Sequence, residues 1–279
     1  MGGLLTIAHL TWLEARRRRI VLAALLCGLG FLLVFAVAVY FIHHNRHAAG
    51  PPPSILQQQI QLQALTLAGL YAVNFLVVAL AVMLPVDALS GEIASGVMQT
   101  IASKPIRRAQ IVLGKWLVYW LMLAAYVVIM VVGIVLAMRL TTGFAQQHVL
   151  PALALMQLEA TVLLSVTIAG GVRFTTVTNG IIAFAFYALA FIGGWIEQIG
   201  VMMGNATARY IGTAISLVSP TDALWRLAMH LLQPPVMSQV QVSPFSSASV
   251  PSAPMVWWSV AFAAGALTLA IRLFQKRAL

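Results

Sequence analysis

The chain is poorest in charged residues. Asp, Glu, Lys and Arg make up 8% of its 279 residues, whereas apolar residues make up 61%. A soluble domain is about a quarter charged, so this chain has too few charged groups to cover a surface in water. The mean hydropathy of +0.95 also excludes a disordered chain. A disulfide-linked scaffold is excluded because Cys27 is the single cysteine. The composition therefore predicts an integral membrane protein.

Acidic residues are scarcer still: 6 acidic residues face 16 basic ones, which gives a net charge of +10. In a soluble protein this imbalance would suggest nucleic-acid binding. In a membrane protein, Lys and Arg mark the cytoplasmic ends of the spans. We favour the second interpretation and expect no nucleic-acid partner.

Six apolar intervals are long enough to cross a bilayer, which needs about 20 helical residues. We therefore expect an all-α polytopic membrane protein with one transmembrane domain over 1–279. The expected spans are 20–42, 64–86, 116–138, 150–172, 174–196 and 255–273. The first interval is longer than the apolar core of a signal peptide, and no Ala-x-Ala-like cleavage site follows it. It is expected to remain as an anchor.

The orientation follows from the basic residues. A cytoplasmic N-terminus places 12 Lys and Arg inside and 4 outside. Both termini are therefore expected in the cytoplasm, in an integral protein of a bacterial cytoplasmic (inner) membrane. The inside set is Arg16 to Arg19, Lys104, Arg107, Arg108, Lys115, Arg173, Arg272, Lys276 and Arg277.

The segments between the spans are unequal. Residues 2–15 are amphipathic, and Glu14 stands four positions before Arg18, which is typical of a helix lying on the inner leaflet. The longest outer segment is 197–254. It includes an apolar helical stretch near Trp225 and ends in a Pro- and Ser-rich loop.

The connection between the second and third spans, 90–115, carries the most information. Glu92 stands where a helix would begin, and Ile93, Val97 and Ile101 recur at helical spacing. This pattern predicts a short amphipathic helix on the membrane surface that ends before Pro105. The basic residues near its end would face lipid headgroups.

The same segment resembles the signature of type-2 ABC transporter permeases, the membrane subunits of ABC exporters. The resemblance rests on six residues that occur together, with six spans and an amphipathic N-terminal helix around them. Val97 and Ile106-Arg107 depart from the Thr and Ser-Arg that several family members have there. The six residues are Gly91, Glu92, Gly96, Pro105, Gly114 and Lys115.

The resemblance implies that two such subunits, as a homodimer or heterodimer, form the path, and that a separate ATPase subunit binds each copy. A coupling helix near 92–103 would contact the ATPase. Lys104, Arg107 and Arg108 would belong to the same interface. ATP and magnesium would be on the partner, since this chain lacks a phosphate loop: Gly114-Lys115 is followed by Trp116. The alternative to a coupling role is an ordinary charged loop that only fixes the membrane topology.

Two polar residues inside expected spans are candidates for the translocation path. Glu159 is the only acidic residue well inside a span, where a carboxylate is costly unless it is paired or neutral. It could contact a substrate or a proton, or be a neutral structural group. Asn74 is the second candidate, although polar residues in spans more often join helices.

Two other functions remain open. A proton-coupled secondary carrier would use Glu159 as a relay and need no ATPase, and a membrane anchor or assembly factor would transport nothing. We expect no metal site, no cofactor in this chain and no enzymatic activity, because no catalytic motif is present. The sequence does not indicate the substrate.

Overall fold

The computed structural model describes all residues except 1–2, 45–53, 97, 99–106, 234–248 and 278–279. The described residues form helices and no strand. Six of these helices are long and apolar enough to cross a membrane. They are α2 (Arg19–His44), α3 (Ile55–Met83), α6 (Arg108–Thr142), α7 (Val149–Gly171), α8 (Thr176–Met202) and α12 (Pro254–Lys276). The expected all-α fold with six candidate spans is confirmed.

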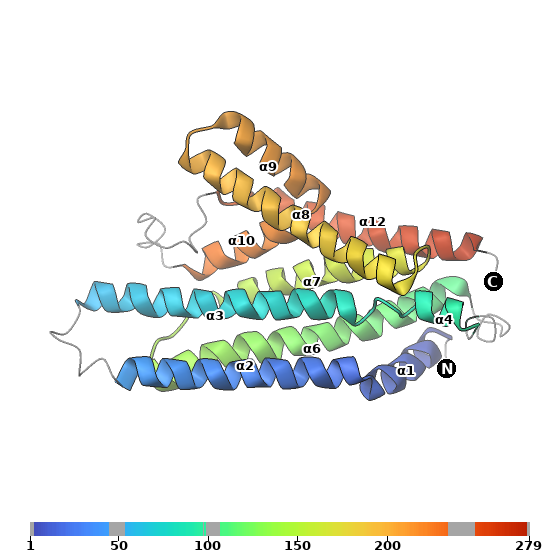
Figure 1. The fold of residues 1–279 in the computed structure, drawn as a ribbon, viewed down its shortest axis with the longest axis horizontal. Coiled ribbons are helices and arrows are strands. Elements are labelled where there is room, and N and C mark those ends of the chain that lie inside the picture. The colour runs from blue at the N-terminus through green and yellow to red at the C-terminus, as the bar shows by residue number, and fades with distance from the viewer. Residues whose placement is uncertain (1–2, 45–53, 97, 99–106, 234–248, 278–279) are drawn as a thin grey trace.

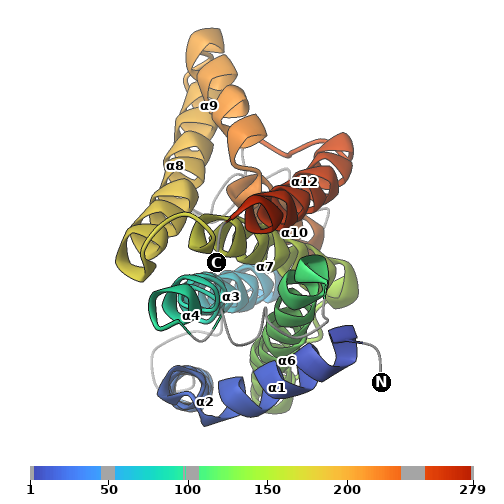
Figure 2. The same ribbon diagram turned by 90° about the vertical axis from the view of Figure 1, so that its right-hand side faces the viewer.

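The centre of the bundle is formed by α3, α6 and α7. Helix α7 packs against α3, α6, α8 and α12 (Figures 1 and 2). Most of α3 is buried within the chain, whereas α2 and α12 expose most of their apolar surface. The outer helices therefore present their apolar side chains to whatever surrounds the chain, and the inner helices hold the core.

Helix α6 is longer than the interval 116–138 that the sequence marked. Its 35 residues correspond to about 50 Å at 1.5 Å per residue, which exceeds the hydrocarbon core of about 30 Å. The additional turns at its start contain Arg108 and Lys115, whose charges ended the apolar interval in the sequence. Charge limited the predicted span, but it does not stop the helix.

The N-terminal helix, α1 (Gly3–Arg17), crosses α6 (Figure 2). Its buried residues Ile7, Thr11 and Ala15 recur every four positions, so one face packs against α6. Gly114 allows the close approach, because a Cβ there would lie 2.9 Å from Ile7 Cγ2. Gly114, one residue of the proposed signature, is thus the point at which α1 packs closely on α6.

The segment 197–254 contains more helix than the sequence indicated. Helix α8 runs on to Met202, and α9 (Ala206–Val218) folds back along it. Helix α10 (Thr221–Leu232) then packs against α7. The turn before α9 depends on Gly204, whose φ of 66° is in the left-handed region that favours glycine. The chain therefore turns back toward the bundle at this end.

Small residues bring α8 and α9 together. A Cβ at Gly212 would lie 2.5 Å from Glu197 Cβ and 2.7 Å from the backbone oxygen of Gly193. Backbone atoms cannot move aside, so this position admits only hydrogen. The hairpin of α8 and α9 is therefore held by backbone contact.

We predict that Gly212→Ala lowers the stability of the chain by about 1–3 kcal/mol, because the added methyl group overpacks this contact. The midpoint of thermal unfolding in detergent measures the effect. Gly265→Ala is the matched control, since a Cβ at Gly265 in α12 meets no atom within 4 Å. Equal midpoints for the two variants would contradict the described contact.

Candidate functional site

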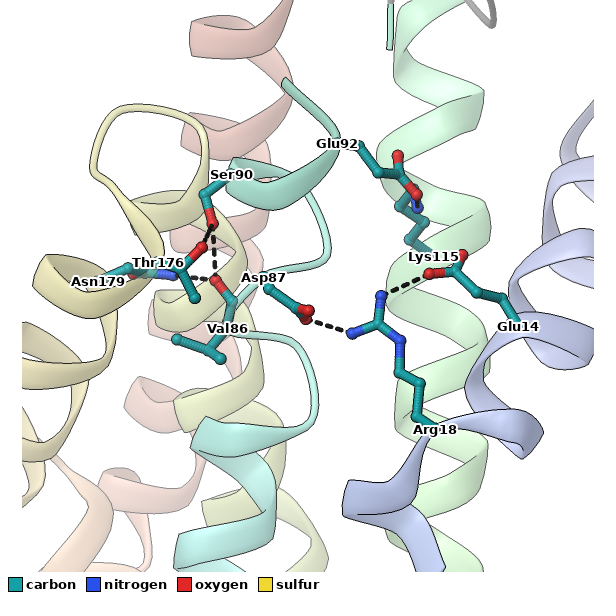
Figure 3. A network of polar contacts seen from close by, with 9 residues as sticks. All are labelled: Glu14, Arg18, Val86, Asp87, Ser90, Glu92, Lys115, Thr176 and Asn179. Carbon is teal, nitrogen blue, oxygen red and sulfur yellow. Dashed lines mark hydrogen bonds and ion pairs between the residues drawn. The ribbon is translucent and has the colours of Figure 1, made fainter. Parts of the chain in front are cut away.

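A network of polar side chains joins α1, α4, α6 and α8 at the end of the bundle where α1 lies (Figure 3). Its centre is α4 (Ser90–Ala94), which follows a series of turns after α3. Helix α4 begins with Glu92 in its first turn, where a carboxylate complements the helix dipole. Contacts from this short helix and the turns before it reach α1, α6 and α8.

The first contact is an ion pair between Glu92 and Lys115. Lys115 Nζ lies 2.5 Å from Glu92 Oε1, and the two side chains are only 3% and 13% exposed. Lysine is almost never buried to this extent without a partner. The other oxygen of Glu92 has no hydrogen-bond partner among the described residues. This pair fixes α4 against α6, and it joins two residues that the sequence analysis placed in one segment but did not pair.

The second contact is centred on Arg18, which lies between α1 and α2. Its guanidinium pairs with Asp87, just before α4, and with Glu14 of α1 at 2.5 Å. Partial burial alone lowers the pKa of Arg18, whereas Tyr119, Glu14 and Asp87 raise it, with a net rise above the ordinary value. Arg18 therefore stays charged and ties α1 to the α3–α4 turn.

The third contact joins this turn to the start of α8. The Ser90 hydroxyl lies 2.9 Å from the Thr176 hydroxyl and donates to the Val86 carbonyl at 3.0 Å. Asn179 Nδ2 donates to the same carbonyl at 3.1 Å (Figure 3). The Val86 carbonyl in the turn is thereby satisfied by side chains of α4 and α8.

The first two contacts border a hollow of about 460 Å³. It is lined by both ionic and small residues, and parts of the network are accessible: the Asp87 side chain is 37% exposed and Glu14 44%. Ala94 and Ser95 of the α4 end are also exposed. A bound partner could therefore reach the network directly. The lining residues are Glu14, Arg18, Asp87, Gly91, Glu92 and Ser95.

The structure differs from the expected helix over 92–103. Helix α4 ends at Ala94, and Gly96 adopts a φ of 75°. A residue in the left-handed conformation cannot continue a right-handed helix, so a continuous helix through position 96 is wrong. Lys104 and Pro105, two residues predicted for this site, lie outside the described residues.

The remaining predicted residues of the segment have structural partners. Arg107 is the N-cap of α6. The Arg108 guanidinium donates to the carbonyls of Gln275 at 3.1 Å and Arg277 at 2.6 Å, at the end of α12. Gly91 lines the hollow, and Gly114 receives α1. The segment is thus joined to both ends of the chain.

The two candidate path residues contact each other in the centre of the bundle. Asn74 Nδ2 of α3 donates to Glu159 Oε1 of α7 at 3.3 Å. Glu159 is fully buried, and within the part of the chain that the structure describes its Oε2 has no hydrogen-bond partner. The pair lies inside the single chain and joins α3 to α7.

A second ionic cluster, which the sequence analysis did not recognise, lies near the far end of α8. Arg226 of α10 pairs with Glu197 of α8 at 2.9 Å and with Asp222 at 2.8 Å, and all three are buried. The Ser249 hydroxyl donates to Glu197. The spacing of Asp222 and Arg226 by four was a signal available in the sequence, whereas their pairing with Glu197 was not.

The pKa of the Asp222 carboxyl is raised above its ordinary value. Burial raises its pKa from 3.8 to about 6, although the Arg226 charge opposes the rise. The Glu197 carboxylate nearby adds to the rise.

A comparison with known protein families gives a match over almost the whole chain. The family described as "ABC-2 family transporter protein" matches residues 5–279. No curated protein matches the sequence.

We predict that Lys115→Met destabilises the chain by about 3 kcal/mol or more, because it leaves the Glu92 carboxylate buried and unpaired. The double variant Lys115→Met and Glu92→Gln should recover much of this loss. Tryptophan fluorescence during thermal unfolding in detergent measures both. Additive effects of the two substitutions would show that the side chains do not interact.

We also predict a pH dependence that originates at Asp222. Because its folded pKa of about 6 exceeds the ordinary 3.8, the folded chain binds this proton more tightly than the unfolded chain. Its contribution to stability is complete below pH 3.8 and is lost as the pH rises through 6. Asp222→Asn should flatten the fall of the thermal midpoint across this window. Parallel curves for the variant and the parent would refute the assignment.

Proposed function

The chain belongs to the ABC-2 family of transporter proteins, and we propose that it is a membrane permease driven by a separate ATPase that docks at α4. The carrying observation is the set of contacts that α4 and the turn before it make. Ion pairs reach α1 through Arg18 and α6 through Lys115, and the Ser90–Thr176 contact reaches α8.

These contacts suit α4 to transmit motion. A force applied to a short helix moves its neighbours only if the links between them are stiff. Here the links are two charge pairs and a set of hydrogen bonds at helix ends, and Lys115 is almost fully buried. A displacement of α4 would therefore carry the ends of α1, α6 and α8 with it. Binding of nucleotide to the partner would favour one of two arrangements of the spans.

We propose that a second copy, or a related subunit, completes the translocation path. The apolar side chains exposed along α2 and α8, such as Leu33 at 65% and Ile181 at 64%, can face lipid or this partner. Asn74 and Glu159 are buried within the single chain, so they can contact a transported molecule only if α3 and α7 move apart.

We further propose export across a bacterial cytoplasmic membrane, with both termini in the cytoplasm. The orientation of the termini is supported by the excess of basic residues at the end of the bundle where α1 and α4 lie. ATP and magnesium would be bound by the ATPase. The alternatives, a proton-coupled carrier and a membrane anchor, would need no ATPase at α4.

We predict that an ATPase with a Gly-x4-Gly-Lys-Ser/Thr motif co-purifies with the tagged full-length chain in gentle detergent, and that Ser95→Trp reduces its recovery at least tenfold, a loss of about 1.4 kcal/mol. The reason is that Ser95 is exposed at the end of α4. Mass spectrometry and ATP hydrolysis by the preparation measure the result.

Thr207→Trp is the matched control, because Thr207 is exposed on α9, far from α4 along the bundle (Figure 1). This variant should retain the ATPase. Absence of an ATPase from the parent preparation in both detergent and lipid nanodiscs would contradict the proposal, as would full recovery with Ser95→Trp.

A further inference from the structure

Three cationic side chains from distant parts of the chain converge on one hollow. Arg173 lies in the turn between α7 and α8, and Lys276 and Arg277 lie at the end of α12. Together with Val172 and Leu273 they line a hollow of about 310 Å³. The end of α12 lies beside the end of α7, and Arg277 contacts Val172 there. The positive-inside rule explains why basic residues lie at this end, but not why three of them share one hollow.

No carboxylate side chain of this protein neutralises the hollow. The chain has only 6 acidic residues, and the structure describes all of them. None lines the hollow. Three lie around Arg18 and Lys115, one contacts Asn74, and two pair with Arg226. They are Glu14, Asp87, Glu92, Glu159, Glu197 and Asp222.

The hollow is held in shape by hydrogen bonds to its edges. The Arg277 guanidinium donates to the Val172 carbonyl, which ties the end of α12 to the α7–α8 turn. Arg108 donates to the carbonyls of Gln275 and Arg277, so the partial negative charge at the end of α12 is already neutralised. The side chains of Arg173 and Lys276 are exposed and make no hydrogen bond or ion pair within the described part of the chain.

We infer that this hollow binds the phosphate group of an anionic phospholipid. Arg and Lys at close quarters are the side chains that bind phosphate, and basic pockets between the ends of membrane helices suit lipid headgroups. Several exposed apolar side chains lie near the hollow along the chain, among polar ones: Phe174 is 43% exposed, Val177 73% and Leu269 52%. They provide surface for acyl chains beside the phosphate site, which free phosphate would not use.

The test compares two triple variants with the same change of charge. The site variant carries Arg173→Gln, Lys276→Gln and Arg277→Gln. The control carries Arg16→Gln, Arg17→Gln and Arg19→Gln, three exposed residues near the same end of the bundle. The full-length chains are placed in nanodiscs of phosphatidylcholine and phosphatidylglycerol, transferred to gentle detergent, and analysed by native mass spectrometry for retained phosphatidylglycerol.

The parent and the control should retain phosphatidylglycerol, and the site variant should lose it at least tenfold, the equivalent of about 1.4 kcal/mol. Equal loss in both variants would overturn the site, because it would show a general effect of charge. If the triple variant does not fold, Lys276→Gln alone decides, since this exposed side chain has no partner within the described chain. Unchanged retention in that variant would also overturn the site.

A second measurement separates lipid from free phosphate. Thermal unfolding of the lipid-depleted parent is followed with added short-chain phosphatidylglycerol or with inorganic phosphate. The midpoint should rise with the lipid and not with phosphate, and the rise should vanish in the site variant. An equal rise with inorganic phosphate would overturn the assignment to a lipid. Neither measurement involves the ATPase, so failure here leaves the proposed function untouched.

Discussion

The pairing of Glu92 with Lys115 determines where α4 lies. Neither charge could be buried to this depth alone, because an unpaired charge in a low dielectric costs several kcal/mol. The pair therefore constrains α4 to one position on α6. Arg18 then has its partner Asp87 within reach, and Ser90 meets Thr176 at the start of α8. A short helix that would be unstable by itself is thus fixed by its neighbours.

A buried ionic cluster also fixes helices at the opposite end of the bundle. Arg226 holds two of the chain's 6 carboxylates and links α10 to α8. Between the two ionic clusters, the central helices α3, α6 and α7 are packed mainly by apolar side chains, with Asn74 and Glu159 as a polar contact. Close-packed helices transmit displacement over their length. The described architecture can therefore connect a movement at α4 with a change at the far end of α8.

Composition and apolar length predicted the six candidate spans, because lipid imposes a length that a sequence displays directly. Glu92 and Lys115 were both singled out, but their pairing depends on how α4 packs on α6, which spacing does not show. Asp87 was missed because it stands in a turn next to an apolar run. Helix α9 was not predicted, since it is too short to span, whereas α10 corresponds to the apolar helical stretch expected near Trp225. The break at Gly96 was missed because a glycine within an apolar pattern does not reveal its φ.

The central claim is that α4 contacts an ATPase. A benzoylphenylalanine placed at position 95 and activated by light in the native membrane tests it directly, because the reagent reacts only with what touches it. The account predicts a covalent adduct with a chain that contains a phosphate-loop ATPase motif, and none from the same reagent at position 207. Adducts from position 95 with lipid or with a second copy of this chain alone would contradict it.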